Sequence, residues 1–320
     1  MRALLGLLAM TMLMDAQAGG AAEDDPLAVP AHVQTHADGR LPLGELLGRY
    51  RPLLEAGWLL EVVAQSHPAG SDTPLPILAL RSPQAGPAAW FISGIHGEEP
   101  AGPNALAQSV ATLLQLGERL PVVVLPLANP QGYVRNWRYL NLPAWSAGQE
   151  AQSVGDASHC LPDPAEPGVA RATAASSPEA AALTAWVLER AQTHPPRWSI
   201  DLHEDNLIDR GYVYSQGVEG ASDPLAATAV AVLREHGIPV QMDGQTRFEE
   251  TIVAGIVGPV IDSSIDELIS APAVIGHDGL EAGPAAHTVL VFETPAAALS
   301  LEQRVAAHKA LIEALVARLP

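Results

Sequence analysis

Short apolar runs, separated by glycine, proline and polar residues, set the pattern of this chain. Runs rich in branched or aromatic residues and of strand length predict β-strands at 58–65, 76–81, 88–94, 121–128, 197–203, 211–216, 238–242 and 288–294. The run at 121–128 is nearly all apolar, which is typical of a strand that is covered on both faces of a sheet.

Helices are predicted between these runs, at 43–55, at 100–116, from Ser177-Pro178-Glu179 onward, at 224–236 and at 301–319. Proline in the first turn favours the helix start at Ser177, and the last helix carries an apolar stripe at helical spacing. Strand, helix and strand follow one another from 88 to 128, which implies parallel pairing. We therefore predict an α/β fold, with an open, twisted, mixed but mainly parallel β-sheet flanked by helices on both faces.

Two stretches, 141–176 and 243–286, show no such pattern. Ordinary loops are much shorter, so we interpret both stretches as binding lids rather than as disordered excursions.

The start of the chain has the pattern of a targeting segment. An apolar stretch at 4–14 precedes Ala16-Gln17-Ala18, and it is too short to span a bilayer as a permanent helix. We expect a cleaved signal peptide at 1–18, a polar linker at 19–40 and a catalytic domain at 41–320. The expected location is secreted or periplasmic, with no membrane span after cleavage.

Composition narrows the classes of partner. A formal charge of −19 repels phosphate backbones, so nucleic acid is excluded as a partner. The acidic surface either favours cationic substrates and metal ions or only keeps the protein soluble. Cys160 is the sole cysteine, which excludes an internal disulfide and a thiolate metal cluster.

Candidate metal ligands stand where predicted strands end. A histidine followed three residues later by an acid is weak evidence, since about one such pair is expected by chance from 11 histidines and 36 acids. His96 and Glu99, however, follow the run at 88–94, and parallel sheets hold ligands at that edge. A catalytic zinc site needs three protein ligands and an open position. His203, the last residue of the run at 197–203, either supplies the third or is a histidine satisfied by hydrogen bonds in the core, and we favour the ligand.

Glu293 ends the run at 288–294, in "VLVFETP". A glutamate there is costly to bury without partners, so it either lines a cleft or forms a structural ion pair. We favour the cleft, where a carboxylate that does not ligate the metal acts as the general base.

Taken together, "GIHGEE" (94–99), "NPQGY" (129–133), "DLH" (201–203) and "VFET" (291–294) resemble the zinc carboxypeptidase superfamily, which includes carboxypeptidase A, aspartoacylase and succinylglutamate desuccinylase. The resemblance spans about residues 58–318. It implies one zinc ion held by His96, Glu99 and His203, with Glu293 activating water to hydrolyse an amide.

Two arginines of "NPQGYVRNWRYLN" are candidates beside the metal. Arg138, nine residues after Asn129 and before Tyr139, is similar in spacing to the aspartoacylase branch, which implies that it stabilises the oxyanion. Arg135 is a substrate-binding candidate. The other interpretation makes both arginines solvated loop cations.

The sequence departs from the family's pattern after these arginines. "NLPAWSAGQ" (141–149) stands where an Asn-Arg pair usually grips the substrate's terminal carboxylate. Asp156 and His159 in "SVGDASH" either contact substrate, orient a zinc histidine or form a turn. Glu204 and Asp205 either receive a cationic substrate group or form an exposed acidic turn.

Three functions remain open. The favoured one is an exported zinc metallohydrolase of carboxypeptidase type, for which cell-wall peptides with free amines are a suitable substrate class. The second is an N-acyl amino acid deacylase similar to aspartoacylase. The third is a non-catalytic metal-binding or peptide-binding protein.

Overall fold

The computed structural model describes residues 25–67, 73–139 and 155–320. The expected signal peptide at 1–18 lies outside these residues. No helix in the described part of the chain is long and apolar enough to cross a membrane.

A ten-stranded sheet runs through the centre of the structure in the order β1-β2-β4-β3-β5-β12-β6-β9-β8-β7. Its strands are β1 (Leu59–Ser66), β2 (Leu75–Arg81), β3 (Ala88–Ser93), β4 (Val122–Leu125), β5 (Pro196–Asp205), β6 (Tyr212–Ser215), β7 (Asp243–Gln245), β8 (Thr251–Val253), β9 (Ile256–Val257) and β12 (Thr288–Pro295). The four central strands β4, β3, β5 and β12 are parallel. Antiparallel strands flank them, so the sheet is mixed, as predicted.

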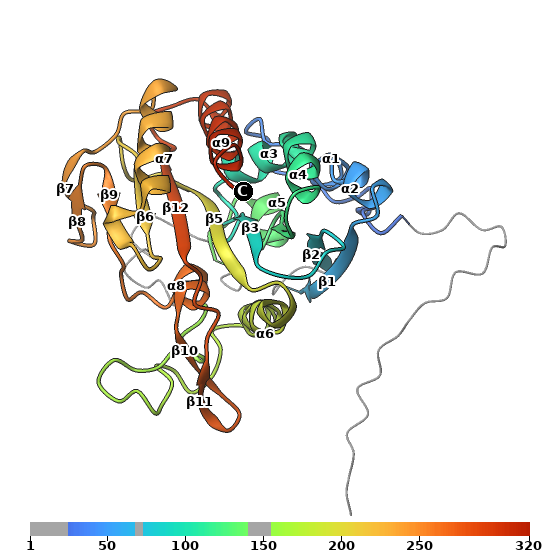
Figure 1. The fold of residues 1–320 in the computed structure, drawn as a ribbon. Helices are drawn as coiled ribbons and strands as arrows, with labels where there is room; N and C mark the ends of the chain where they lie inside the picture. Colours follow the sequence, from blue (N-terminus) through green and yellow to red (C-terminus); the bar gives the residue numbers. More distant parts are fainter. Residues whose placement is uncertain (1–24, 68–72, 140–154) are drawn as a thin grey trace, which may run out of the picture.

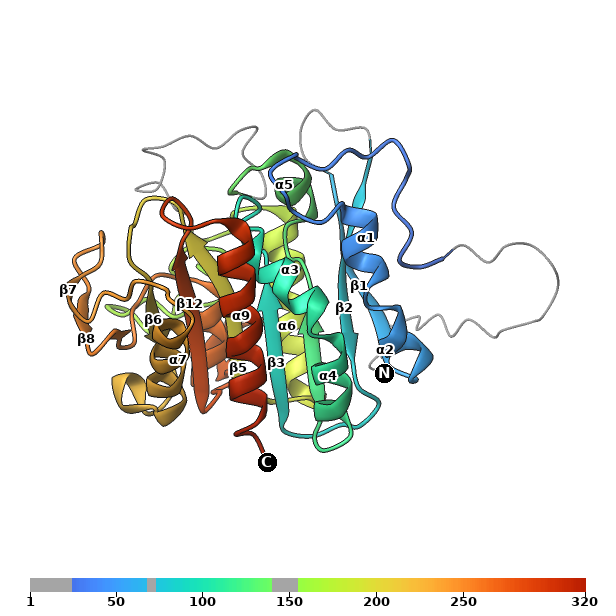
Figure 2. The same cartoon turned by 90° about the horizontal axis from the view of Figure 1, so that it is seen from above.

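Helices cover both faces of this sheet (Figures 1 and 2). They are α1 (Leu43–Gly48), α2 (Arg51–Glu55), α3 (Ala101–Gln108), α4 (Val110–Gly117), α5 (Pro130–Arg135), α6 (Pro178–Thr193), α7 (Pro224–Glu235), α8 (Ile265–Ser270) and α9 (Leu301–Val316). In Figure 1, α3, α4, α7 and α9 lie over one face, and α6 and α8 lie on the other. The predicted fold class is confirmed.

The central strands are buried on both faces, which explains their continuous apolar sequence. On one face, Phe91 and Phe292 belong to the core formed with α3 and α9. On the other face, Trp90 packs with Trp186 of α6, their ring centroids 5.4 Å apart. These two layers hold the ends of β3, β5 and β12 in fixed positions.

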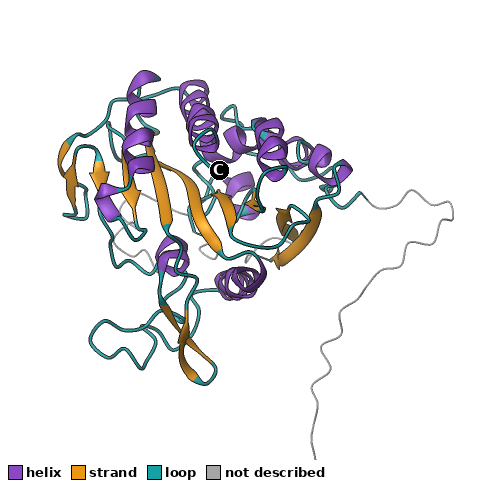
Figure 3. Cartoon of the chain, viewed as in Figure 1, coloured by secondary structure: helices purple, strands orange, loops and turns teal. Residues whose placement is uncertain are grey.

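Several elements differ from the sequence prediction (Figure 3). The helix predicted at 100–116 is interrupted at Ser109, whose hydroxyl donates to the carbonyl of Ala105. The prediction of a strand at 238–242 is wrong, because only Val240 forms an isolated bridge, to Gly211. Helix α5 was not predicted, although Asn129 caps it and Pro130 starts it.

The stretch at 243–286 is not an irregular lid. It contains β7, β8, β9, α8 and a separate hairpin of β10 (Ala273–Gly276) and β11 (Gly279–Ala282). Strands of two to four residues give no readable alternation, which is why the sequence pattern missed them. Of the other stretch, 141–176, the described part forms turns and a bridge between Pro162 and Ala170.

Residues 25–40, part of the expected linker, lie against the domain. Leu27 is buried, and the side chain of Arg40 is fully covered. The Arg40 guanidinium donates to the carbonyls of Gly97 and Tyr133 and to the side chains of Asp38 and Asn136. This segment therefore braces the loop that carries His96 and Glu99.

Arg40→Met is expected to lower the free energy of unfolding by about 2 to 4 kcal/mol, because it leaves several buried acceptors without a donor. Urea unfolding measures the change. The matched control is Arg49→Met, which removes an exposed arginine paired with Glu45 and should cost below about 0.5 kcal/mol. Equal losses in the two variants would contradict the bracing role of Arg40.

Candidate metal centre

Three parallel strands bring their carboxyl ends to one edge of the sheet. Strand β3 leads into His96, β5 carries His203, and β12 carries Glu293. In the register of β12 with β5, Glu293 lies directly opposite His203. Because side chains alternate along a strand, both residues project to the same face of the sheet.

Close backbone contacts shape the turn after β3. Gly94 has φ of +65°, a left-handed conformation that favours glycine. A Cβ atom at Gly97 would lie 2.1 Å from the carbonyl carbon of Gly132, so only glycine fits there. The glycines of "GIHGEE" thus let the chain turn sharply and press against α5.

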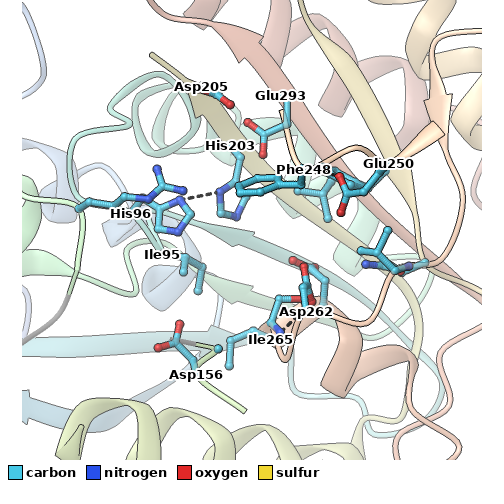
Figure 4. Close-up of a pocket in the computed structure, with 18 of the residues that line it drawn as sticks. Ile95, His96, Asp156, His203, Asp205, Phe248, Glu250, Asp262, Ile265 and Glu293 are labelled. Atoms are coloured by element: carbon cyan, nitrogen blue, oxygen red, sulfur yellow. Dashed lines mark hydrogen bonds between the residues drawn. The ribbon is translucent and has the colours of Figure 1, made fainter. Parts of the chain in front are cut away.

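The three predicted metal ligands meet at this edge. His96 Nδ1 lies 2.8 Å from Glu99 Oε1, and His203 Nδ1 lies 3.0 Å from Glu99 Oε2. The two ring nitrogens, His96 Nδ1 and His203 Nδ1, are 3.2 Å apart, a contact drawn in Figure 4. Within the described residues, these side chains form one of two groups with suitable donor atoms for a metal.

The donor set fits a tetrahedral cation. Ligand atoms about 2.0 to 2.1 Å from zinc lie about 3.3 Å from one another, close to the spacings of these three side chains. Two ring nitrogens facing each other can share only one proton. Two imidazoles and a carboxylate are also the ligands that zinc prefers. A cation placed between them would satisfy all three donors at once.

Neighbouring groups hold two of these ligands in position. His203 Nε2 lies 3.2 Å from Asp201 Oδ2, and Glu99 Oε2 accepts the backbone N–H of Glu204. Asp201, His203 and Asp266 form the second group of potential ligands, which shares His203 with the first and is buried. Asp201 is thus placed to orient the imidazole of His203, as partners of metal ligands commonly do.

The charges of the cluster shift one another's pKa. Burial lowers the pKa of His96 to about 4, and the nearby Arg138 adds to this effect. Burial alone would raise the pKa of Glu99, but His96 and His203 hold it well below its usual range. Burial also opposes protonation of His203, yet Asp201 and Glu99 raise its pKa. Glu99 is therefore ionised and His96 neutral, which are the forms that bind a cation, whereas His203 carries a proton that it would lose when a cation binds.

Glu293 lies beside the three donors, and contacts with the protein do not use its carboxyl group fully. Its Oε2 atom is buried and has no hydrogen-bond partner among the described residues. Burial raises the pKa of Glu293 to about 8, and the opposing charge of His203 does not cancel this effect. Figure 4 shows the carboxyl group directed toward His203.

Arg138 contacts the carboxylate of a candidate ligand. Its Nη1 atom donates to Glu99 Oε1 at 2.8 Å and to Glu98 Oε1 at 2.9 Å. Burial and the charge of Glu99 raise the pKa of Glu98 to about 7. The two adjacent acids therefore differ in their contacts: both pair with Arg138, but only Glu99 also meets the two histidines.

A cavity of about 1070 Å³ opens on this cluster. Its lining includes His96, Arg138, Asp156, His203 and Glu293, so five of the eight predicted site residues share it. Glu99 lies just beneath, buried. Arg135 and His159 are not among the described lining residues. The Arg135 guanidinium stacks on Trp137 at 4.6 Å, and His159 Nε2 lies 3.1 Å from Thr184 Oγ1.

The two acids after His203 have different surroundings. Glu204 is buried, pairs with Arg304 of α9 and also lines the cavity, so it is not an exposed turn residue. Asp205 lines the cavity. Burial raises the pKa of Asp156 to about 6 on the opposite wall.

The sequence pattern did not point to part of the cavity lining. Arg247, Phe248 and Glu250 come from the turn between β7 and β8, and Asp262 and Asp266 come from the segment at and before α8. The signals were weak, because these residues lie in strands and turns too short to be recognised.

Comparisons with known proteins bear on the fold. A scan of the sequence against models of known families finds no match, and a search of curated proteins finds none either. A candidate metallopeptidase of Shewanella amazonensis is similar in structure, with a TM-score of 0.63 and 23% identity over 86% of this chain and 94% of that one.

Two further solved structures are more distant. Carboxypeptidase A of Helicoverpa armigera has a TM-score of 0.51 and 14% identity over 84% of this chain and 70% of that one. Bovine thrombin-activatable fibrinolysis inhibitor, solved with a tick carboxypeptidase inhibitor, has a TM-score of 0.51 and 15% identity over 88% and 98%. The chain therefore shares the fold of these solved metallopeptidase and carboxypeptidase structures, which is the fold that the sequence motifs predicted.

Proposed function

We propose that the protein is an exported, zinc-dependent hydrolase that cleaves amide bonds in peptides, of carboxypeptidase type. The observation that carries this proposal is the convergence of His96, Glu99 and His203, from two strand ends, with Glu293 opposite His203 on a third. The fold shared with metallopeptidases supports it. Export is inferred from the apolar stretch at 4–14 alone.

In this proposal His96, Glu99 and His203 hold one zinc ion. Zinc, when bound, polarises a carbonyl and makes water more acidic. Glu293 accepts the proton of the attacking water and passes it to the leaving nitrogen, because its carboxyl group points toward His203 and has an oxygen without a hydrogen-bond partner. The charge of a bound dication would lower the raised pKa of Glu293 and so keep it ionised for this role. Arg138 stabilises the negative charge that develops on the carbonyl oxygen.

Hydrolysis of small amides tests the proposal. The zinc-loaded full chain is incubated with N-acylated dipeptides and with N-acyl amino acids, and the released amino acid is quantified. We expect zinc-dependent release of the C-terminal residue from the dipeptides. Exclusive cleavage of N-acyl amino acids would identify a deacylase instead. Zinc binding without cleavage of either class would indicate a binding protein.

A further inference from the structure

Asp266 of α8 approaches the metal cluster from an element that carries none of the proposed ligands. The potential ligand atoms of Asp201, His203 and Asp266 lie within 4.8 Å of one another. The exposed fractions of these three residues are 0%, 6% and 4%. Asp266 also lines the cavity. The mechanism proposed above gives no role to this buried acid.

The position of Asp266 is fixed by its neighbours on α8. Ile265 and Leu268 are buried in the core on this face of the sheet. Glu267 forms an ion pair with Arg171, in which Oε1 lies 2.6 Å from Nη2. Helix α8 packs against both β5 and β12. The carboxyl group of Asp266 is therefore held in one place relative to β5.

The carboxyl groups of Asp201 and Asp266 are in hydrogen-bond contact. Such a contact needs a proton on one of the two, because an ionised carboxylate only accepts hydrogen bonds. The Oδ1 atom of Asp266 is buried and receives no hydrogen bond from the described residues, so a charge on this group would be uncompensated. Burial, and then the charge of Asp201, raise the pKa of Asp266 well above its usual range. Asp266 is therefore the donor of the pair.

Asp201 links Asp266 to a proposed metal ligand. Its Oδ1 atom accepts the backbone N–H of Leu202 at 2.8 Å, and its Oδ2 atom lies 3.2 Å from His203 Nε2. The opposite ring nitrogen, His203 Nδ1, lies 3.0 Å from Glu99 Oε2. The orientation of the Asp201 carboxylate therefore determines where His203 Nδ1 points.

We propose that Asp266 is a positioning residue of the metal site, which donates a hydrogen bond to Asp201 and so holds the imidazole of His203 in the orientation that binds the cation. This inference rests on the zinc site of the proposed function, but not on the hydrolysis of any substrate. It makes α8, which lies outside the strand ends, a structural part of that site. Groups that orient metal ligands typically raise metal affinity 10- to 100-fold.

The zinc affinity of the full chain, measured by competition with a chelator, tests the proposal. Asp266→Ala should weaken zinc binding about 10- to 100-fold, because it removes the donor to Asp201. Asp266→Asn should stay within about threefold of the wild type, because its neutral amide can donate from the same place. Equal losses in the two variants would show that Asp266 acts through its charge, and no loss in Asp266→Ala would show that it positions nothing. Either result overturns the proposal.

A double-mutant cycle tests whether the effect passes through Asp201. Asp201→Ala should itself weaken zinc binding, and the addition of Asp266→Ala should weaken it less than about threefold further, since the two residues act in series. Losses that multiply would overturn the proposal, because Asp266 would then act independently of Asp201. A second zinc ion that the wild type binds and Asp266→Ala loses would also overturn it, because Asp266 would then be a ligand.

Asp262→Ala is the matched control. Asp262 lines the same cavity four residues before Asp266, but it does not belong to the group formed with His203 among the described residues. Its removal should change the zinc affinity less than about threefold, and a loss equal to that of Asp266→Ala would overturn the proposal. Asp266→Leu, which fills the site with an apolar side chain, should lose zinc affinity as Asp266→Ala does. The result then does not depend on the folding of one variant.

Hydrolysis of dipeptides by the same proteins separates this inference from the proposed function. A loss of zinc affinity in Asp266→Ala, with no hydrolysis by the zinc-loaded wild type, supports the role of Asp266 and rejects the proposed hydrolase. Zinc-dependent hydrolysis by the wild type, with unchanged zinc affinity in Asp266→Ala, rejects the positioning role and leaves the proposed hydrolase in place.

Discussion

Glu293→Gln is expected to lower the rate of hydrolysis at least about 1000-fold while zinc binding is kept. Glutamine has the same shape as glutamate but cannot accept the proton of water at neutral pH. The side chain is not one of the three proposed ligands, so the metal site should remain intact. Measurement of kcat, together with the zinc content of the purified variant, tests both parts of the prediction.

The control for this variant is Asp262→Asn. Asp262 lines the same cavity, but on the segment before α8 rather than at a strand end. Its loss should change kcat less than about tenfold, because it lies outside the group formed by Glu293 and the ligands. Activity near the wild-type level in Glu293→Gln would remove Glu293 from the mechanism.

Removal of the metal should abolish hydrolysis and also destabilise the protein. The ligand cluster gathers buried carboxylates whose mutual repulsion a dication would relieve. At a zinc concentration about 100 times the dissociation constant, binding adds about 2.7 kcal/mol to the free energy of unfolding. This corresponds to a rise in Tm of about 4 °C for a chain of this size. Chelation followed by zinc addition should reverse both changes.

His203→Ala provides the matching variant. It should fail to retain zinc through dialysis, show no hydrolysis and lack the rise in Tm on zinc addition. His236→Ala, an exposed histidine after α7, is the control and should behave as the wild type. A His203→Ala protein that still gains stability from zinc would place the ion elsewhere, for example among other surface acids.

The sequence predicted the structure best in the central strands, because burial on both faces restricts which residues fit there. The runs ending at Gly94, His203 and Thr294 are apolar on both sides because helices cover both faces of the central sheet. A polar residue at the end of such a run stands out, and three of these run ends marked the candidate site.

Contacts between residues far apart in the sequence determine the features that the sequence did not predict. The helix predicted at 100–116 breaks because a serine hydroxyl competes for a backbone carbonyl, which no apolar period reveals. Arg247 was missed because its position depends on Tyr214 and Glu250, residues 36 positions apart. The substrate-binding roles expected of Arg135 and His159 rested on sequence proximity to the motifs and stay predictions; the side chains of these residues contact Trp137 and Thr184.

The hairpin of β7 and β8 forms the outer edge of the sheet, at the left of Figure 1. It contributes Arg247 and Phe248 to the cavity, while the proposed zinc ligands and Glu293 come from the sheet interior. The turn and the strand ends are therefore separate segments of the chain that meet at one cavity. We expect that a different turn grafted between Gln245 and Thr251 would change the shape of the outer cavity wall and leave the side chains at the strand ends in place.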